Sequence, residues 1–372
     1  MHRRDKRLER KPGPVVIALL LCPAAAFAQQ PDSIIPIDSI VVAAPRAIAT
    51  PGGASAIVGS LRDLAVMPAP TLETTLRRMP LVQVRRNSRG EAQVGIRGSS
   101  ERQVAVLVDG VPVSLGWDHR TDLSVVPVGA ARSITLVRGL SSVLHGPNVL
   151  GGVVEVGVAR GTRLLAPPPP FEIAAGAEHT GGYSASTSMA RYAHAGGREI
   201  LLRAGGGWRE DPGQIAAPGT PAALVDDGRR RNSDVQQASG FLSGRYIGTA
   251  GQWLSASAFA LTGERGVMSE AHVAEPRFWR YPLTRRVIAA VSGGTGHHRT
   301  PLGAGDIEAS VGFDMNRAEI DAFTDGSYTV LEEEEDADTR TLTLRLLADH
   351  TVGARGELRT AATYADEGHE ET

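Results

Sequence analysis

The sequence predicts a compact α+β domain followed by antiparallel strands of a transmembrane β-barrel, which is incomplete with about nine strands. Three observations predict this fold class. The chain has seven Phe, four Trp and six Tyr, of which only Phe27 and Trp117 precede residue 171. Between residues 51 and 160, short apolar runs alternate with glycine-containing turns. After residue 171, apolar and polar residues alternate with the period of two that marks a strand with two different faces.

Residues 1–28 have the features of a secretory signal peptide. A basic start precedes the apolar run Val15–Leu21 and then Ala26-Phe27-Ala28, a small-x-small cleavage site. The apolar run is far shorter than the ~20 residues of a membrane-spanning helix. Cys22 is the only cysteine and lies in this segment, so we expect neither disulfides nor thiolate chemistry in the mature chain.

The composition excludes some function classes. Charged residues make up 22% of the chain and the formal net charge is −2, which offers no basic surface for nucleic acid. No later apolar stretch approaches the length of a membrane-spanning helix. An exported chain of this kind is predicted to be periplasmic, secreted, or a barrel in an outer membrane.

Residues 29–50 are predicted to form a tether. They are polar and contain prolines on both sides of one β-branched run, Ile40-Val41-Val42. A short apolar strand on a tether suits pairing with the sheet edge of a partner protein, although an ordinary edge strand has the same pattern.

Residues 51–160 have the pattern of a globular domain. Thr71 is a suitable N-cap for a helix over Leu72–Met79, which Pro80 ends. Glycine directly follows several strands, where a positive φ is needed. Strands are predicted at residues 82–84, 93–96, 104–108, 133–137 and 153–156.

The order of five motifs in this domain closely resembles the plug domain of TonB-dependent outer-membrane receptors. Two departures, Leu81 where this family commonly has Gly and His145 where Tyr is frequent, leave the glycine framework intact. The motifs are Arg78-Met79-Pro80, Val94-Gly95-Ile96-Arg97-Gly98, Leu107-Val108-Asp109-Gly110-Val111-Pro112, Val137-Arg138-Gly139 and Ser142–Val153.

The resemblance implies partners and a function. The TonB box of such receptors pairs with TonB, the energy-transducing protein of the inner membrane. The implied location is the outer membrane of a Gram-negative-type bacterium, in contact with its lipid. The implied function is active uptake of a scarce ligand, such as a ferric siderophore or cobalamin, without a cofactor. The segment that looks like the TonB box consists of Asp38, Ser39, Ile40, Val41, Val42 and Ala43.

Two loops of the plug domain are candidates for contact with the ligand. Arg85–Glu91 and Leu115–Thr121 each carry several side chains that form hydrogen bonds. Trp117 in the second loop suits stacking on a ligand, although it could instead pin this loop to the barrel wall. The predicted ligand-binding residues are Arg86, Asn87, Arg89, Trp117, Asp118, His119 and Arg120.

Residues 161–170 are predicted to be a proline-rich hinge, and residues 171–372 a partial barrel. Short turns alternate with long connections at 210–235, 266–283 and 324–337, as in barrels with periplasmic turns and extracellular loops. A soluble sandwich shows the same alternation with the apolar face turned inward, so alternation alone leaves both folds open. Strands are predicted at residues 171–179, 183–193, 199–209, 236–247, 252–265, 284–296, 305–323, 338–350 and 356–366.

Two charge runs are placed in these long connections. Glu332–Asp336 lies in the third and Arg229–Arg231 in the first. We interpret both as solvated loop segments, although each could attract ions of the opposite charge.

Searches for enzyme chemistry are negative. The chain lacks Gly-x-Ser-x-Gly, His-Glu-x-x-His, Cys-x-x-Cys and phosphate-loop patterns, so we predict no catalytic residue and no metal site. The leading hypothesis is the plug and first part of the barrel of a TonB-dependent receptor. The alternatives are a soluble periplasmic or secreted β-rich binding protein or enzyme, and a passive porin. Because plugged transporters have 22 strands, about nine predict a fragment that cannot transport by itself.

Overall fold

The computed structural model describes most of the chain after residue 54. The expected signal peptide (1–28), tether (29–50) and TonB box (38–43) lie outside the described residues. No helix of the described part is long and apolar enough to cross a membrane. The described residues are 55–61, 64, 66–114, 120–138, 145, 149–160, 164, 167–300, 303–353 and 356–372.

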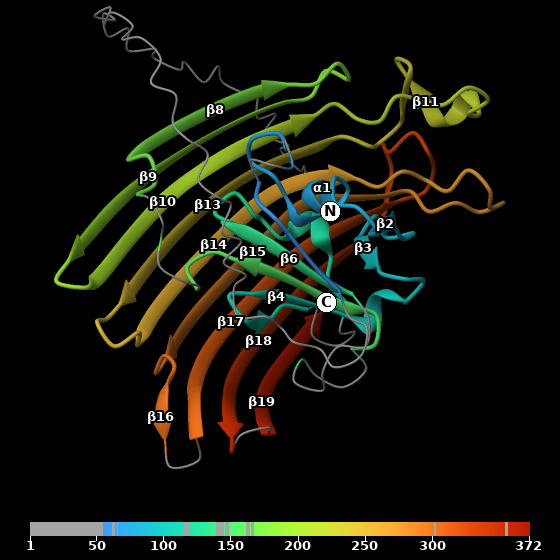
Figure 1. Cartoon of the computed structure of the whole chain (residues 1–372). Coiled ribbons are helices and arrows are strands. Elements are labelled where there is room, and N and C mark those ends of the chain that lie inside the picture. The colour runs from blue at the N-terminus through green and yellow to red at the C-terminus, as the bar shows by residue number, and fades with distance from the viewer. Residues whose placement is uncertain are drawn as a thin grey trace, which may run out of the picture. The chain divides into compact units, whose positions relative to one another are not determined.

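The first folded part of the chain, here called the plug, is built on a five-stranded sheet (Figure 1). Its elements are β1 (Ser55–Gly59), α1 (Leu72–Leu76), β2 (Gln83–Arg86), β3 (Ala92–Gly95), β4 (Val104–Val108), β5 (Val111–Pro112), β6 (Ser133–Arg138) and β7 (Gly152–Gly157), with 3-10 helices at Glu101–Gln103 and Leu123–Val125. The order in the sheet is β1-β6-β7-β4-β5, with β4 and β7 parallel and the other pairs antiparallel. β2 and β3 form a separate hairpin.

Helix α1 begins where the sequence predicts and ends earlier. Thr71 and Thr74 form a capping box, in which each backbone N–H donates to the hydroxyl of the other residue, at 3.1 and 3.4 Å. The helix ends at Leu76 rather than at Met79. From Arg78 onward the N–H groups bond three residues back instead of four, which tightens the chain into a turn.

Two short strands of the plug, β1 and β5, were not predicted. β1 pairs with β6 and adds an edge to the sheet, although its sequence holds only two β-branched residues. β5 forms a hairpin with β4 through Asp109 and Gly110. Their φ angles are 47° and 83°, so both central residues have the positive φ that a two-residue type I′ turn needs. The predicted positive φ at this glycine is confirmed.

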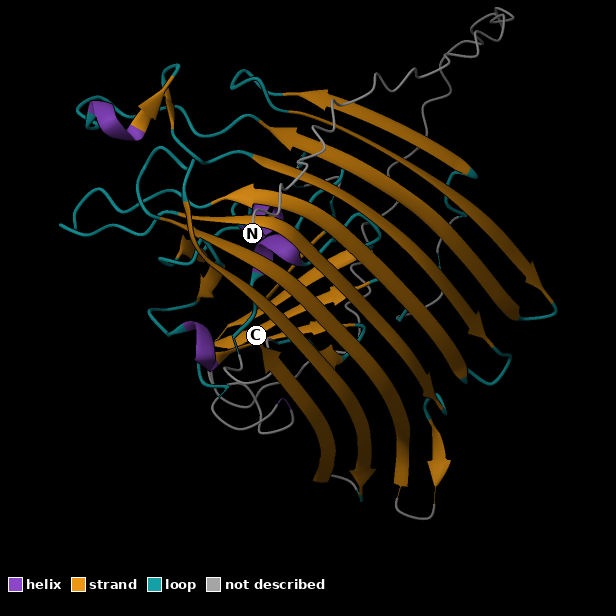
Figure 2. Ribbon diagram, turned by 180° about the vertical axis from the view of Figure 1, so that it is seen from behind, coloured by secondary structure: helices purple, strands orange, loops and turns teal. Residues whose placement is uncertain are grey.

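The second folded part, here called the wall, is an antiparallel sheet of ten strands (Figure 2). They are β8 (Phe171–Ala177), β9 (Tyr183–Ala195), β10 (Arg198–Asp211), β13 (Val235–Ile247), β14 (Trp253–Gly266), β15 (Trp279–Gly294), β16 (His298–Thr300), β17 (Gly303–Phe323), β18 (Leu331–Val352) and β19 (Gly356–Glu371). The order is β19-β18-β17-β15-β14-β13-β10-β9-β8, and β16 pairs with β17. All nine predicted strands are present. The connection from β10 to β13 carries a 3-10 helix at Ala222–Leu224 and the hairpin of β11 (Val225–Asp226) and β12 (Arg229–Arg230).

The acidic run Glu332–Asp336 lies in a strand and not in the loop that the sequence predicts. β18 already begins at Leu331, and the carboxylate-bearing residues pair with β17 in the register Glu335↔Ile320 and Asp336↔Glu319. The third connection is therefore shorter than predicted. Acidic residues have low strand propensity, but pairing with a neighbouring strand overrides this preference.

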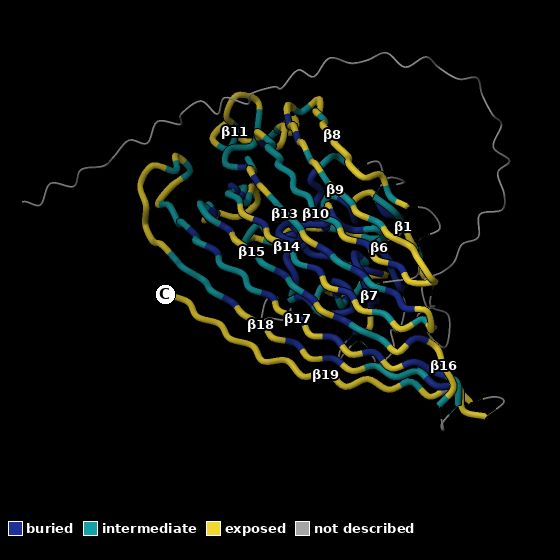
Figure 3. Tube along the Cα trace, turned by 90° about the vertical axis from the view of Figure 1, so that its left-hand side faces the viewer, coloured by how far each residue is buried: buried dark blue, intermediate teal, exposed yellow. Residues whose placement is uncertain are grey.

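The direction of the apolar side chains decides between a barrel wall and a soluble sandwich. On β18, Leu342 and Leu344 are 40% and 44% exposed, whereas Thr343 and Arg345 are 3% and 5% exposed. Figure 3 shows this alternation of buried and exposed positions along the wall strands. The polar residues face the plug, since Arg345 donates from Nη1 to the Gly110 carbonyl at 2.5 Å. A wall with apolar residues outside and polar residues inside has the pattern of a transmembrane barrel. Within the described residues the sheet is not closed, because β8 and β19 are its edges.

Polar contacts hold the plug against the inner face of the wall. The buried Asp109 carboxylate accepts a hydrogen bond from Ser257 on β14 at 2.7 Å. Arg160, which follows β7, donates to Glu308 on β17 at 2.7 Å. The position of the plug is therefore fixed by directional bonds to several wall strands.

The outward face of the wall generates a prediction about how the cost of a charged residue depends on its depth in the lipid bilayer. Leu344→Arg should destabilise the protein in a lipid bilayer by about 2–4 kcal/mol, because a guanidinium would enter the middle of the apolar layer. Leu331→Arg at the loop end of the same strand is the matched control, with a similar exposure of 40%. It should cost about 0–1 kcal/mol. Denaturant midpoints in lipid vesicles measure both, and equal costs would contradict the barrel assignment.

Candidate ligand-binding site

The turn between β2 and β3 brings the plug to the end of the wall where the long connections begin. Asn87 shapes this turn. Its Oδ1 accepts the N–H groups of Arg89 and Glu91, both at 3.0 Å, and its Nδ2 donates to Glu91 Oε2 at 2.6 Å. The predicted ligand-binding residue Asn87 is thus engaged within the plug.

Arg86 is also engaged within the plug. Its guanidinium binds both carboxylate oxygens of Glu73 on α1, at 3.0 and 3.1 Å, and Arg77 binds the same carboxylate. Burial alone would raise the pKa of the Glu73 carboxyl, but the charges and hydrogen bonds of Arg86 and Arg77 hold this pKa below its usual value. Arg86 therefore joins β2 to α1.

Arg89 reaches across to the wall. It donates from Nη2 to Glu335 Oε1 on β18 at 3.0 Å, and its guanidinium lies over the Trp279 ring, 5.4 Å from the centroid. Arg277 lies 5.0 Å from the same centroid and donates to Ser88 Oγ at 2.8 Å. Two guanidinium groups therefore contact one indole at the plug apex, one from the plug and one from a wall connection.

Arg120 lies beside the same turn from the other loop. Its Nη1 is 4.0 Å from Glu91 Oε2. Burial and the nearby Asp122 charge raise the pKa of the Glu91 carboxyl. Asp122 in turn binds Arg265 of β14 at 3.0 Å. Burial opposes ionisation of Asp122, but Arg265 and bonds from Ser124 keep its pKa low.

The described residues bring three of the predicted ligand-binding residues together. Asn87, Arg89 and Arg120 all surround Glu91, whereas Arg86 is directed to Glu73 instead. The remaining three, Trp117, Asp118 and His119, lie outside the described residues.

The wall residues of this cluster were not among the residues predicted from the sequence. Arg277, Trp279 and Glu335 come from connections and strand ends that are far from the plug in sequence. The available signal was an aromatic residue between basic residues, Arg277-Phe278-Trp279-Arg280, at the end of a long connection. Within the described residues, no group of three or more His, Cys, Asp and Glu side chains could hold a metal ion.

The run Arg229–Arg231 is not a solvated basic patch, because its side chains link neighbouring connections of the wall by hydrogen bonds. Each guanidinium donates to a backbone carbonyl of another connection, and Arg229 also donates to one in its own connection. The bonds run from Arg229 to Thr180 and Gly213 (2.5 and 2.7 Å), from Arg230 to Ser269 (2.7 Å) and from Arg231 to Gly326 (3.3 Å). Arginine suits this task because its donors are fixed in a planar fork.

Comparison with known proteins identifies the plug. Residues 50–153 match the family model of the TonB-dependent receptor plug domain. A segment of 95 residues is 30% identical to the vitamin B12 transporter BtuB of Photobacterium profundum, covering 25% of this chain and 16% of that protein.

Solved structures match the plug and the wall together. The copper transporter OprC superposes with a TM-score of 0.64 at 17% identity, over 85% of this chain and 46% of that one. A ferric enterobactin receptor (PfeA) from Pseudomonas aeruginosa gives a TM-score of 0.55 at 16% identity, over 84% and 48%. P. aeruginosa FpvA, bound to a pyoverdine–iron complex, gives 0.53 at 10% identity, over 85% and 52%.

The chain spans about half the length of the solved structures that it matches. It contains a plug domain, recognised by sequence, and a partial barrel wall, recognised by fold. Residues 50–153 therefore form a TonB-dependent receptor plug domain, and the plug and wall together have the fold of the matched structures.

Proposed function

We propose that this chain forms the plug and the first barrel strands of an outer-membrane receptor that takes up a scarce ligand with energy supplied through TonB. The observation that carries the proposal is the wall with apolar residues outside and polar residues bonded to a plug inside. Such a wall needs lipid on its outer face. A plug inside it needs an external source of work before anything can pass.

Binding takes place, in this proposal, where the plug apex meets the long connections. The guanidinium groups of Arg89 and Arg277, the Trp279 indole and the carboxylates of Glu91 and Glu335 offer both stacking and charged hydrogen bonds there. None of these groups needs to react with the ligand. The site therefore supports reversible binding and release rather than catalysis.

Release would follow when TonB pulls on the segment Asp38–Ala43 and the plug shifts within the wall. The bonds that hold the plug favour such a shift. A hydrogen bond between a charged group and its partner across this boundary can be exchanged for bonds to water at a net cost of about 1.5–3 kcal/mol, so an external force can break such bonds one at a time.

The names of the relatives support the proposed ligand class. Their names refer to vitamin B12, copper and the iron complexes of enterobactin and pyoverdine. We propose a ferric siderophore, cobalamin or a similar scarce ligand for this chain. The Arg and Trp side chains at the apex suit a large ligand with aromatic and anionic groups.

The alternative is a soluble periplasmic or secreted β-rich protein. Membrane fractionation separates the two proposals. We expect the protein in the detergent-extracted outer membrane, and recovery in the soluble periplasmic fraction would contradict the receptor proposal.

The expected TonB box generates a prediction for the full-length protein. Deletion of residues 38–43 should abolish energy-dependent uptake of the ligand and leave its binding to whole cells unchanged, because the apex is not altered. Uptake and binding of labelled ferric siderophores and cobalamin measure the two effects. Uptake that persists after the deletion would support a passive porin instead.

The apex generates a second prediction. Arg89→Ala should weaken ligand binding about tenfold, because it removes a charge-assisted contact at the proposed site. Loss of its half-exposed pair with Glu335 should change stability by less than about 1 kcal/mol. Arg85→Ala is the matched control, since Arg85 lies in the same hairpin and pairs with Glu101 at 2.6 Å. Equal affinity of the two variants, measured against the same ligand panel, would remove Arg89 from the site.

A further inference from the structure

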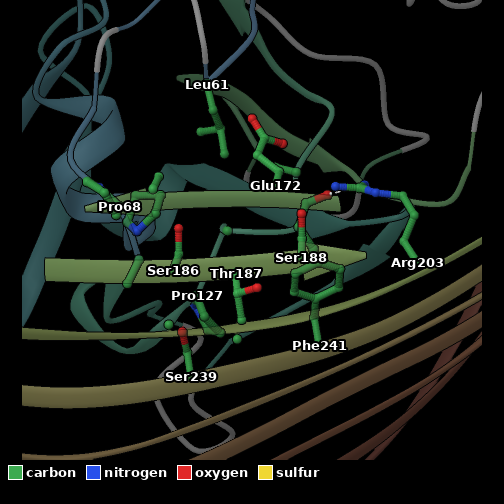
Figure 4. A pocket seen from close by; sticks show the side chains of 18 of the residues that line it. Leu61, Pro68, Pro127, Glu172, Ser186, Thr187, Ser188, Arg203, Ser239 and Phe241 are labelled. Carbon is green, nitrogen blue, oxygen red and sulfur yellow. Dashed lines mark hydrogen bonds between the residues drawn. The ribbon is translucent and has the colours of Figure 1, made fainter. Parts of the chain in front are cut away.

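A cavity of about 470 Å³ lies between the plug and the inner faces of β8, β9, β10 and β13 (Figure 4). Residues 60–61, 66–70, 127 and 129–132 line it on the plug side. It shares no lining residue with the apex cluster around Trp279. Its volume is in the range of small-molecule sites, which span about 300–1,000 Å³.

Two guanidinium groups line this cavity, and both are only partly compensated. Arg203 of β10 donates from Nη1 to the Ala130 carbonyl at 2.8 Å and lies over the Phe241 ring, 5.5 Å from its centroid. Arg132 of the plug is half-buried, and no carboxylate of the described residues lies within ion-pair distance of it. The lining contains a single carboxylate, that of Glu172, whose charge partly compensates that of Arg203.

A third guanidinium adds to the positive charge behind the lining. Arg245 is buried and bonds Glu199 at 2.5 Å, while its Nε and Nη1 have no hydrogen-bond partner among the described residues. The second oxygen of Glu199 accepts the Leu164 N–H at 3.0 Å, so both oxygens of this carboxylate are engaged. Burial, and then the charges of Arg245 and Arg203, lower the pKa of Arg132 to about 10. The guanidinium groups therefore repel one another here.

The cavity also supplies neutral donors. The hydroxyl groups of Ser186 and Ser188 on β9 and of Ser239 on β13 belong to its lining. Figure 4 shows these side chains around the same space as Arg203 and Phe241. Guanidinium groups and hydroxyls are the donors that carboxylate and phosphate oxygens bind with the strongest hydrogen bonds.

We propose that this cavity is a binding site for a small oxyanion, a carboxylate or a phosphate, held between Arg132 and Arg203. The anion neutralises two crowded guanidinium groups and accepts hydrogen bonds from the serine hydroxyls. Anion binding in the cavity can be measured without transport, so its test is independent of the proposed receptor function.

The test is calorimetric titration of the full chain in detergent with inorganic phosphate and, separately, with succinate. We expect saturable binding of at least one of them, which distinguishes the phosphate source from the carboxylate source. Arg132→Gln and Arg203→Gln should each weaken this binding tenfold or more. No saturable binding of either anion would overturn the proposal.

A control variant excludes general electrostatic attraction. Arg198→Gln removes a guanidinium from an exposed position at the start of β10, outside the cavity. It should leave the dissociation constant unchanged within twofold. If Arg198→Gln weakens binding as much as Arg203→Gln does, the anions bind by overall charge and the cavity is not their site.

Thiol labelling gives an independent measurement if a glutamine variant fails to fold. Replacing Cys22 by Ser and Ser188 by Cys places one thiol in the lining. An anionic methanethiosulfonate should label it at least tenfold faster than a cationic one, and phosphate or succinate should slow the labelling. Faster labelling by the cationic reagent would contradict an anion site.

Discussion

The position of the plug depends above all on the Asp109 carboxylate. The type I′ turn places this side chain where it accepts the N–H groups of Val158 and Ala159, at 2.7 and 3.1 Å, in the chain that leaves β7. The same carboxylate accepts the Ser257 hydroxyl of the wall at 2.7 Å. One buried anion thus fixes the β4–β5 hairpin, the exit of the plug chain and the nearest wall strand. Burial of a charge is tolerated only with this many donors.

The polar inner face of the wall follows from the same cost of burying polar groups without partners. Because lipid covers the outer face, the polar side chains of the wall point inward, where they need hydrogen-bond or ion-pair partners. Arg286 and Asp314 pair between neighbouring strands at 2.7 Å, while Arg265 crosses to Asp122 of the plug at 3.0 Å. The desolvation of such pairs largely cancels their attraction, so their main effect is to set the position of the plug rather than to add stability.

The sequence predicts the strands of the wall well and the contacts between its parts poorly. The period of two is a local property of the sequence, so the nine strands can be predicted from it. It does not show whether the apolar face of the sheet points outward or inward. β18 extends over Glu332–Asp336 because pairing with β17 overrides local propensity. Arg86 and Asn87 have the residue types of a binding loop, yet their partners lie within the plug. The Arg89–Glu335 contact joins residues too far apart for any local pattern to reveal.

The bonds between plug and wall are distributed unevenly around the plug. Strands β14, β17 and β18 bind it through Ser257, Glu308 and Arg345, whereas along β8 to β10 the plug faces the large cavity and is bonded by Arg203 through the Ala130 carbonyl. On that side the plug approaches the wall closely at Gly176 and Gly207, where an added Cβ would lie 2.6 Å from Met67 Cε and 2.7 Å from Ala69 Cβ. The plug is therefore positioned by buried polar bonds on the Asp109 side and by close backbone approach on the side of β8 to β10, where Arg203 also bonds it.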